Sequence, residues 1–124
     1  NLNKVIEQRR KNALIYMKAL DRRFVFFNNE TKEEFNTYHT FVVQVNSRNK
    51  LKKYLLDKGI GTSIHYPVPI HLQPASKFLG YEKGDFKNTE MQSQKILTLP
   101  VNESLSVDQI EYICRCINQF YVNK

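Results

Sequence analysis

The sequence predicts an α/β (α+β) two-layer sandwich, in which helices pack on a small, largely antiparallel sheet of three to four short strands. Two observations support this class. Apolar residues recur every three or four positions near both ends of the chain, and short apolar runs lie between these helical stretches. The length of 124 residues fits one domain. Hydrophobic residues make up 41%, enough for a core without disulfide or metal support.

Two helices are expected in the first half of the chain. An apolar stripe runs through residues 2–20, and arginine and lysine fill much of the opposite face. A second helix covers about residues 48–58. Ser47 is its expected cap, and Gly59 ends it where the chain must turn left-handed.

The last helix is marked by Ser106 and Gln109, which have the spacing of a capping box. Its apolar stripe includes Cys114 and leaves Cys116 on another face, because residues two apart point roughly 200° apart on a helix. The two thiols therefore should not pair with each other. We expect them to be reduced, as in a cytoplasmic protein.

Short strands and turns fill the middle of the chain. The expected strands are residues 24–27, 38–46, 61–64 and 96–99. Residues 74–79 should form a helical turn with Pro74 near its start. A short helix should open at Thr89 and Gln92, which again have capping-box spacing.

The net charge of +7 is unevenly distributed. Residues 1–58 carry 13 Lys or Arg against 6 Asp or Glu, whereas residues 59–124 carry 6 of each. A basic face can hold nucleic acid, so a basic nucleic-acid-binding α/β module is one alternative. No known recognition pattern accompanies the charge, and we expect no specific nucleic acid. No apolar run approaches the length of a membrane span.

Residues 65–71, His-Tyr-Pro-Val-Pro-Ile-His, are the strongest candidate for a binding site. Two prolines fix the backbone and exclude a helix. Imidazole and phenol groups can donate hydrogen bonds to hydroxyls or phosphate. The alternative is a polar loop that packs on its own domain.

No metal site is expected, since the three histidines lack the spacing of zinc ligands. Three nearby carboxylates, Glu82, Asp85 and Glu90, flank a turn. We expect them to be solvated, with one at the first turn of a helix.

Between Gly59 and Pro100 the sequence contains, in order, Gly-Ile-Gly-Thr, His-Tyr-Pro-Val-Pro-Ile-His-Leu-Gln, Leu-Gly-Tyr, Thr-Glu and Leu-Thr-Leu-Pro. This ordered string resembles the C-terminal region of the DegT–DnrJ–StrS family of sugar aminotransferases. The helix at 7–20 and the strand at 38–43 resemble that region too, so the likeness covers nearly the whole chain.

The resemblance implies a fold-type I enzyme that depends on pyridoxal phosphate and works as a homodimer. Such enzymes transfer an amino group from glutamate to a keto-sugar linked to a nucleoside diphosphate, with a dTDP-linked keto-6-deoxyhexose as the expected example. The products serve amino-sugar and cell-surface polysaccharide biosynthesis, including lipopolysaccharide. The family also contains dehydratases with the same cofactor, which leaves a sugar dehydratase as a second alternative. A purely structural or dimer-forming fragment is a third alternative.

By the same resemblance, residues 1–124 are the C-terminal small domain, residues 1–20 are the helix that enters it, and the large cofactor-binding domain is absent. None of the 13 lysines stands in a context like the family's Schiff-base motif. We therefore expect no catalytic or cofactor-binding residue here, and an inactive fragment. His65, Tyr66 and His71 match the loop that reaches the sugar, with Gln73 as a fourth substrate-binding residue.

Overall fold

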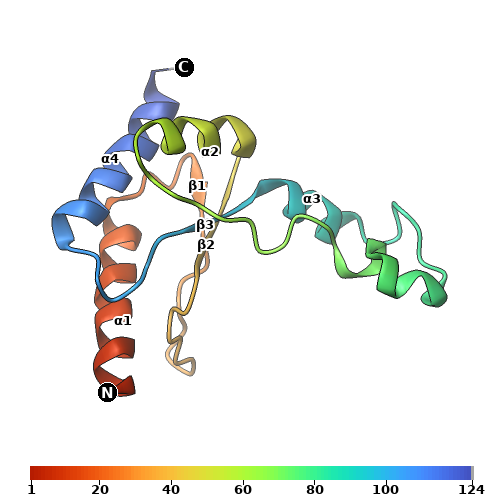
Figure 1. The fold of residues 1–124 in the computed structure, drawn as a ribbon, viewed down its shortest axis with the longest axis horizontal. Coiled ribbons are helices and arrows are strands. Elements are labelled where there is room, and N and C mark those ends of the chain that lie inside the picture. Colours follow the sequence, from red (N-terminus) through yellow and green to blue (C-terminus); the bar gives the residue numbers. More distant parts are fainter. Residues whose placement is uncertain (124) are drawn as a thin grey trace.

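A computed structural model describes residues 1–123 (Figure 1). The elements follow in the order α1 (Leu2–Ala19), β1 (Val25–Phe26), β2 (Phe41–Val45), α2 (Arg48–Asp57), η1 (Ile70–Leu72), η2 (Pro74–Leu79), α3 (Lys87–Lys95), β3 (Ile96–Leu99) and α4 (Val107–Val122). The two η elements are 3-10 helices. Within residues 1–123, no helix is long and apolar enough to cross a membrane.

The sheet has three strands in the order β1-β2-β3, and both pairings are antiparallel. Val25 faces Val45 across the first pair, and Phe41 faces Leu99 across the second. Residues 61–64, expected as a further strand, contribute a single bridge from Ser63 to Thr98. The predicted α/β class with a small antiparallel sheet is confirmed, with strands shorter than the patterns indicated.

One face of the sheet carries the core. The alternation of β2 buries Phe41, Val43 and Val45 and leaves Val42 exposed. These residues form one cluster with the buried side chains of α1, α2 and α4. In Figure 1 these three helices lie on one side of the molecule, away from the segment between residues 65 and 86.

Polar bonds hold α1 to the segment that follows β3. The Tyr16 hydroxyl donates to the Pro100 carbonyl over 2.7 Å, and Asn12 Nδ2 donates to the Asn102 carbonyl over 2.7 Å. Both side chains are fully buried. Burial raises the pKa of the Tyr16 phenol, which therefore stays a neutral donor.

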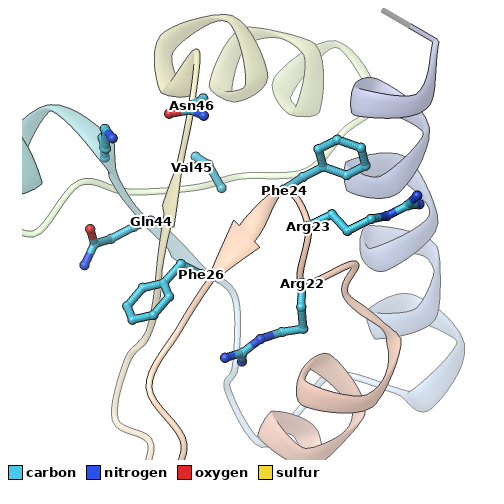
Figure 2. Close-up of a pocket in the computed structure, with 8 residues that line it drawn as sticks. Arg22, Arg23, Phe24, Phe26, Gln44, Val45 and Asn46 are labelled. Atoms are coloured by element: carbon cyan, nitrogen blue, oxygen red, sulfur yellow. The ribbon is translucent and has the colours of Figure 1, made fainter.

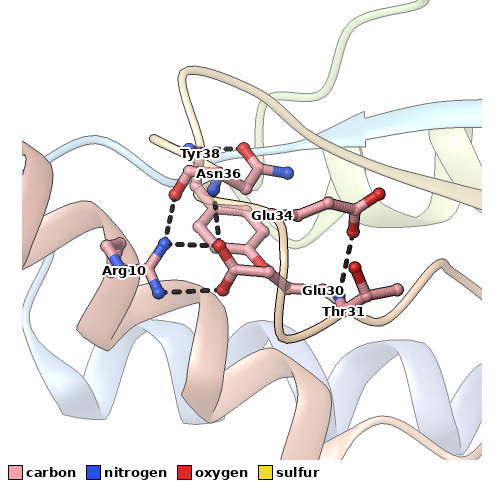
Figure 3. Close-up of polar contacts among 6 residues, drawn as sticks. All are labelled: Arg10, Glu30, Thr31, Glu34, Asn36 and Tyr38. Atoms are coloured by element: carbon pink, nitrogen blue, oxygen red, sulfur yellow. Dashed lines mark hydrogen bonds and ion pairs between the residues drawn. The ribbon is translucent and has the colours of Figure 1, made fainter.

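The chain between β1 and β2 is pinned to α1 by Arg10 (Figure 3). Its two Nη atoms donate to the two carboxylate oxygens of Glu30, each over 2.8 Å, and Nη1 also donates to the Asn36 carbonyl over 2.6 Å. The guanidinium lies 4.4 Å from the centre of the Phe35 ring. The Arg10 partner and the Asn36 amide lower the pKa of Glu30. This polar stretch is thus an ordered loop.

The capping box that opens α4 is confirmed. Ser106 Oγ accepts from the Gln109 amide over 3.2 Å, and Gln109 Oε1 accepts from the Ser106 amide over 3.0 Å. The prediction for Cys116 is wrong, because this thiol is as buried as Cys114. Helix α4 packs against both α1 and α2, so its buried arc is wider than one apolar stripe. Burial raises the pKa of Cys114 to about 12, and the two thiols are unpaired.

Two other caps differ from expectation. Ser47 stands at the N-cap of α2, but it has a left-handed backbone with φ 54° and its side chain makes no capping bond. The prediction of a capping box at Thr89 and Gln92 is wrong, because α3 begins at Lys87 and Thr89 already lies inside the helix. At the other end of α2, Gly59 has φ 77°, the left-handed turn that the sequence predicted.

Neighbouring leucines in α2 provide a test of the core. Leu55 is fully buried, whereas Leu56 is 66% exposed. Replacing Leu55 with Ala should lower the free energy of unfolding by about 2–5 kcal/mol, because it removes packed atoms and leaves a cavity. The matched change Leu56→Ala should cost under about 0.5 kcal/mol. Urea unfolding measures both, and equal losses would contradict the placement of the core.

Candidate functional site

The candidate site lies on a segment that leaves the sheet at β3. We call residues 65–86 the arm; it contains η1 and η2 and returns to the sheet through α3. In Figure 1 the arm extends well beyond the sheet and carries its two short helices at the far end. Two prolines, Pro67 and Pro69, keep its first part extended.

His65 anchors the arm to the sheet. The bridge between Ser63 and Thr98 consists of backbone hydrogen bonds of 2.7 and 3.2 Å. It places His65 Nδ1 3.0 Å from Thr98 Oγ1 in a further hydrogen bond. Within residues 1–123 the other ring nitrogen, Nε2, has no partner. His65 is therefore held at one ring nitrogen and can offer the other to a ligand.

Tyr66 presents a free phenol next to this histidine. The peptide bond between the two residues is cis, and their rings meet edge to face with centres 5.4 Å apart. Tyr66 is 70% exposed, and its hydroxyl bonds to nothing in the described part of the chain. A phenol in this position can donate or accept a hydrogen bond.

His71 lies in a different environment. Its Nε2 is 3.1 Å from Glu90 Oε1 on α3, and the two side chains are only 8% and 14% exposed. The His71 ring packs on Phe86, with centres 4.8 Å apart. Glu90 Oε1 also accepts from the Gly84 amide over 2.7 Å. His71 thus joins the two limbs of the arm to α3.

Gln73 also bonds within the arm, because its Nε2 donates to the Val68 carbonyl over 3.3 Å. The structure therefore brings the four expected site residues together only in part. His65 and Tyr66 are in contact, while no hydrogen bond or ring contact within residues 1–123 joins either of them to His71 or Gln73.

The expectation of a carboxylate in the first turn of a helix is confirmed by Glu90 in α3, but its interpretation as a solvated group is wrong, since its side chain is only 14% exposed. The Gly84 amide, and after it His71, lower the pKa of this carboxyl against the opposing effect of burial. Glu90 lies 19 positions after His71, a spacing that matches no local motif. Only the fold of the arm brings the two residues together, so no signal in the sequence could have paired them.

No metal site is formed by the described residues, since His, Cys, Asp and Glu nowhere gather in a group of three or more among residues 1–123. His39, the third histidine, instead lies beside α1, where its Nδ1 is 3.2 Å from Arg9 Nη1.

The fold and the arm define a mixed α/β unit, in which helices cover a three-stranded antiparallel sheet and a long segment extends from it. Residues 1–118 match the model of the DegT/DnrJ/EryC1/StrS aminotransferase family, and the chain belongs to that family. The resemblance seen in the motif order of residues 59–100 is thereby confirmed.

Three comparisons describe the relationship. The chain is 32% identical to a pleiotropic regulatory protein of Geobacillus stearothermophilus, over 98% of this chain and 33% of the relative. It is 27% identical to a dTDP-3-amino-3,6-dideoxy-alpha-D-galactopyranose transaminase of Aneurinibacillus thermoaerophilus, over 92% of this chain and 31% of that protein. The crystal structure of S. venezuelae DesV in complex with a ketimine intermediate has the same fold, with a TM-score of 0.89 and 24% identity over 95% of this chain and 32% of that one. The chain thus spans about one third of these relatives.

The family includes sugar aminotransferases that depend on pyridoxal phosphate. A lysine that binds the cofactor as a Schiff base is desolvated in a pocket. No lysine among residues 1–123 is buried; Lys52 and Lys95 are half-buried and the others are exposed. The residues present therefore do not fit a complete site for the cofactor.

The lowered pKa of Glu90 gives the arm a pH dependence. A carboxyl whose folded pKa is below its unfolded value contributes stability above the unfolded pKa and loses it as the pH falls through the folded pKa. We expect the NMR shift of the Gly84 amide proton to titrate with a midpoint below the usual range for Glu. Glu90→Gln should abolish this titration, whereas Glu33→Gln should leave it unchanged. An unaltered Gly84 titration in Glu90→Gln would show that the contact is absent in solution.

Proposed function

We propose that this chain is the C-terminal small domain of an enzyme that transfers an amino group from glutamate to a keto-sugar linked to a nucleoside diphosphate. The match of residues 1–118 to the family carries the proposal. The one-third coverage of the relatives supports the view that a large domain precedes this region in the whole protein. We assign residues 1–20 as the helix that enters the small domain.

In the proposed enzyme, His65 and Tyr66 position the sugar. A polyhydroxylated ligand needs donors and acceptors at fixed places, and these two neighbouring rings each have an uncommitted polar atom within residues 1–123. The bond to Thr98 fixes His65 on the sheet. The exposed phenol of Tyr66 is free to reach a partner.

His71 and Gln73 act in the proposal mainly by shaping the same loop. Within residues 1–123 their polar contacts are directed to Glu90 and to Val68, inside or next to the arm. All four residues of the predicted substrate site thus keep a role.

Aminotransfer is favoured over dehydration because relatives are named as transaminases of dTDP-linked amino sugars. We accordingly propose a dTDP-linked keto-6-deoxyhexose as substrate and a place in cell-surface polysaccharide biosynthesis. Two unpaired buried thiols, Cys114 and Cys116, suit a reducing compartment such as the cytoplasm.

The exposed apolar side chains of the arm support a homodimer, or a contact with another domain, in the whole enzyme. Ile70 is 77% exposed and Phe78 is 84% exposed. Both lie on 3-10 helices that contact each other, and large apolar groups exposed close together often mark an interface. We propose that these side chains are covered in the assembled enzyme.

Tyr66→Phe in the full-length enzyme tests the sugar site. Loss of one hydrogen bond to the sugar should cost about 1–3 kcal/mol in the keto-sugar half-reaction and much less in the glutamate half-reaction. Tyr81→Phe removes a hydroxyl from another exposed tyrosine of the arm and is the matched control. Single-turnover kinetics separate the two half-reactions. Wild-type rates with the keto-sugar for Tyr66→Phe, at an unchanged melting temperature, would remove Tyr66 from the site.

The isolated 124-residue chain should be inactive. A lysine that forms a Schiff base must be desolvated, and no lysine among residues 1–123 is buried. Incubation with pyridoxal phosphate, borohydride reduction and peptide mapping should give only scattered partial labelling of exposed lysines. Stoichiometric labelling of one lysine would refute this expectation.

A further inference from the structure

Two hollows adjoin one another at the end of the sheet opposite Phe41. The first, of about 210 Å³, lies where β1 begins and β2 ends, and its lining includes Arg22 and Gln44 (Figure 2). Lys95 also lines it. The second, of about 530 Å³, shares Val45, Asn46 and Lys95 with the first and adds Arg48 and Lys50. We call the two together the basic trough; it lies outside the arm.

The lining of the trough has one sign of charge. It contains five arginines or lysines and no aspartate or glutamate. One of the five, Arg23, is neutralised by Asp21, with Nη2 to Oδ2 at 2.6 Å, and Figure 2 shows its side chain extending toward α4. The other four form no ion pair with any residue from 1 to 123. A concave surface of one sign concentrates ions of the opposite sign.

Two of these cations are held in place before any ligand arrives. The Arg22 guanidinium stacks on Phe27, 3.9 Å from the ring centre. Arg48 Nη1 donates to the carbonyls of Ile96, over 3.0 Å, and of Ser93, over 3.4 Å, while Nε donates to Asn49 Oδ1 over 2.7 Å. These three bonds leave both hydrogens of Arg48 Nη2 unused. Fixed guanidinium groups lose little entropy when they bind an anion.

Neutral donors complete the lining. The side-chain amides of Gln44 and Asn46 make no hydrogen bond within the described part of the chain. The backbone of Asn46 is fixed, since its carbonyl accepts a 2.6 Å bond from the Tyr121 hydroxyl. Four cations without acidic partners and two free amides, spread over adjoining hollows, suit an anion with several charges and several acceptor oxygens.

We propose that the basic trough binds the polyphosphate group of a small molecule, with a diphosphate as the minimal ligand. The adjoining hollows offer places for two neighbouring phosphates, with Lys95 between them. The exposed ring of Phe26 at the edge of the first hollow can contact a ring attached to the phosphates. This inference does not depend on the proposed aminotransferase activity.

Calorimetry on the 124-residue chain tests the proposal, with inorganic pyrophosphate as the probe at constant ionic strength. We expect saturable binding at one site. Lys95→Gln and Arg22→Gln should each weaken it about tenfold, as for loss of a charge-assisted contact. Lys4→Gln, an exposed lysine outside the trough, removes the same charge and should change the affinity less than about twofold. Melting curves confirm that each variant is folded. Lys95→Gln changes the charge of the trough without removing the contact between Arg22 and Phe27.

Three further ligands identify what is recognised. Inorganic phosphate should bind at least about tenfold more weakly than pyrophosphate, because it cannot span both hollows. If a nucleoside diphosphate binds as tightly as pyrophosphate, the trough recognises the phosphates alone. If it binds more tightly, and Phe26→Ala removes this extra affinity, the trough recognises a nucleotide. Either result supports the proposal. Equal losses in Lys4→Gln and Lys95→Gln would overturn it. Binding of single-stranded DNA that depends on Lys95 and that pyrophosphate does not displace would also overturn it.

Discussion

The two-sided pairing of β3 determines where the candidate site stands. On one edge Thr98 lies opposite Val42 of β2, and on the other its amide and carbonyl pair with Ser63. Its side chain then binds His65. A single threonine thus fixes the point at which the chain leaves the sheet, and the prolines that follow carry that direction outward. A shift of one residue in this register would turn every side chain of the strand to the opposite face.

The sheet is covered by helices on one face only. The core cluster joins α1, α2 and α4 to that face, whereas Phe26 and Val42 remain exposed on the other. A one-sided sheet of three short strands is a modest scaffold. Here the buried hydroxyl of Tyr16 and the ion pair of Arg10 with Glu30 reinforce it by tying α1 to distant parts of the chain. The open face and the arm take no part in these ties and stay available for further contacts.

The sequence predicted the elements whose signals are local. The capping box of Ser106 and Gln109 and the left-handed turn at Gly59 involve residues close in the chain, and both are confirmed. Predictions that depend on distant neighbours were less accurate. Cys116 is buried because two helices flank α4. The carboxylate of Glu90 is hydrogen-bonded because the fold of the arm brings His71 and Gly84 to it. Residue type and spacing located the candidate loop, but only the fold distinguishes its exposed tyrosine from its packed histidine.

That distinction has a physical basis in how each polar atom is used. The carboxylate of Glu90 keeps its charge to lower pH than usual, so near neutral pH it holds both the Gly84 amide and the His71 ring. His71 can therefore stiffen the far end of the arm without exchanging partners. His65 gives one nitrogen to the sheet and keeps the other, and Tyr66 gives nothing within residues 1–123. At the far end of the arm the polar atoms of His71 and Glu90 bond to each other, whereas beside the sheet His65 and Tyr66 keep polar atoms that have no partner within residues 1–123. A ligand would find these free groups on a support that its binding need not reorganise.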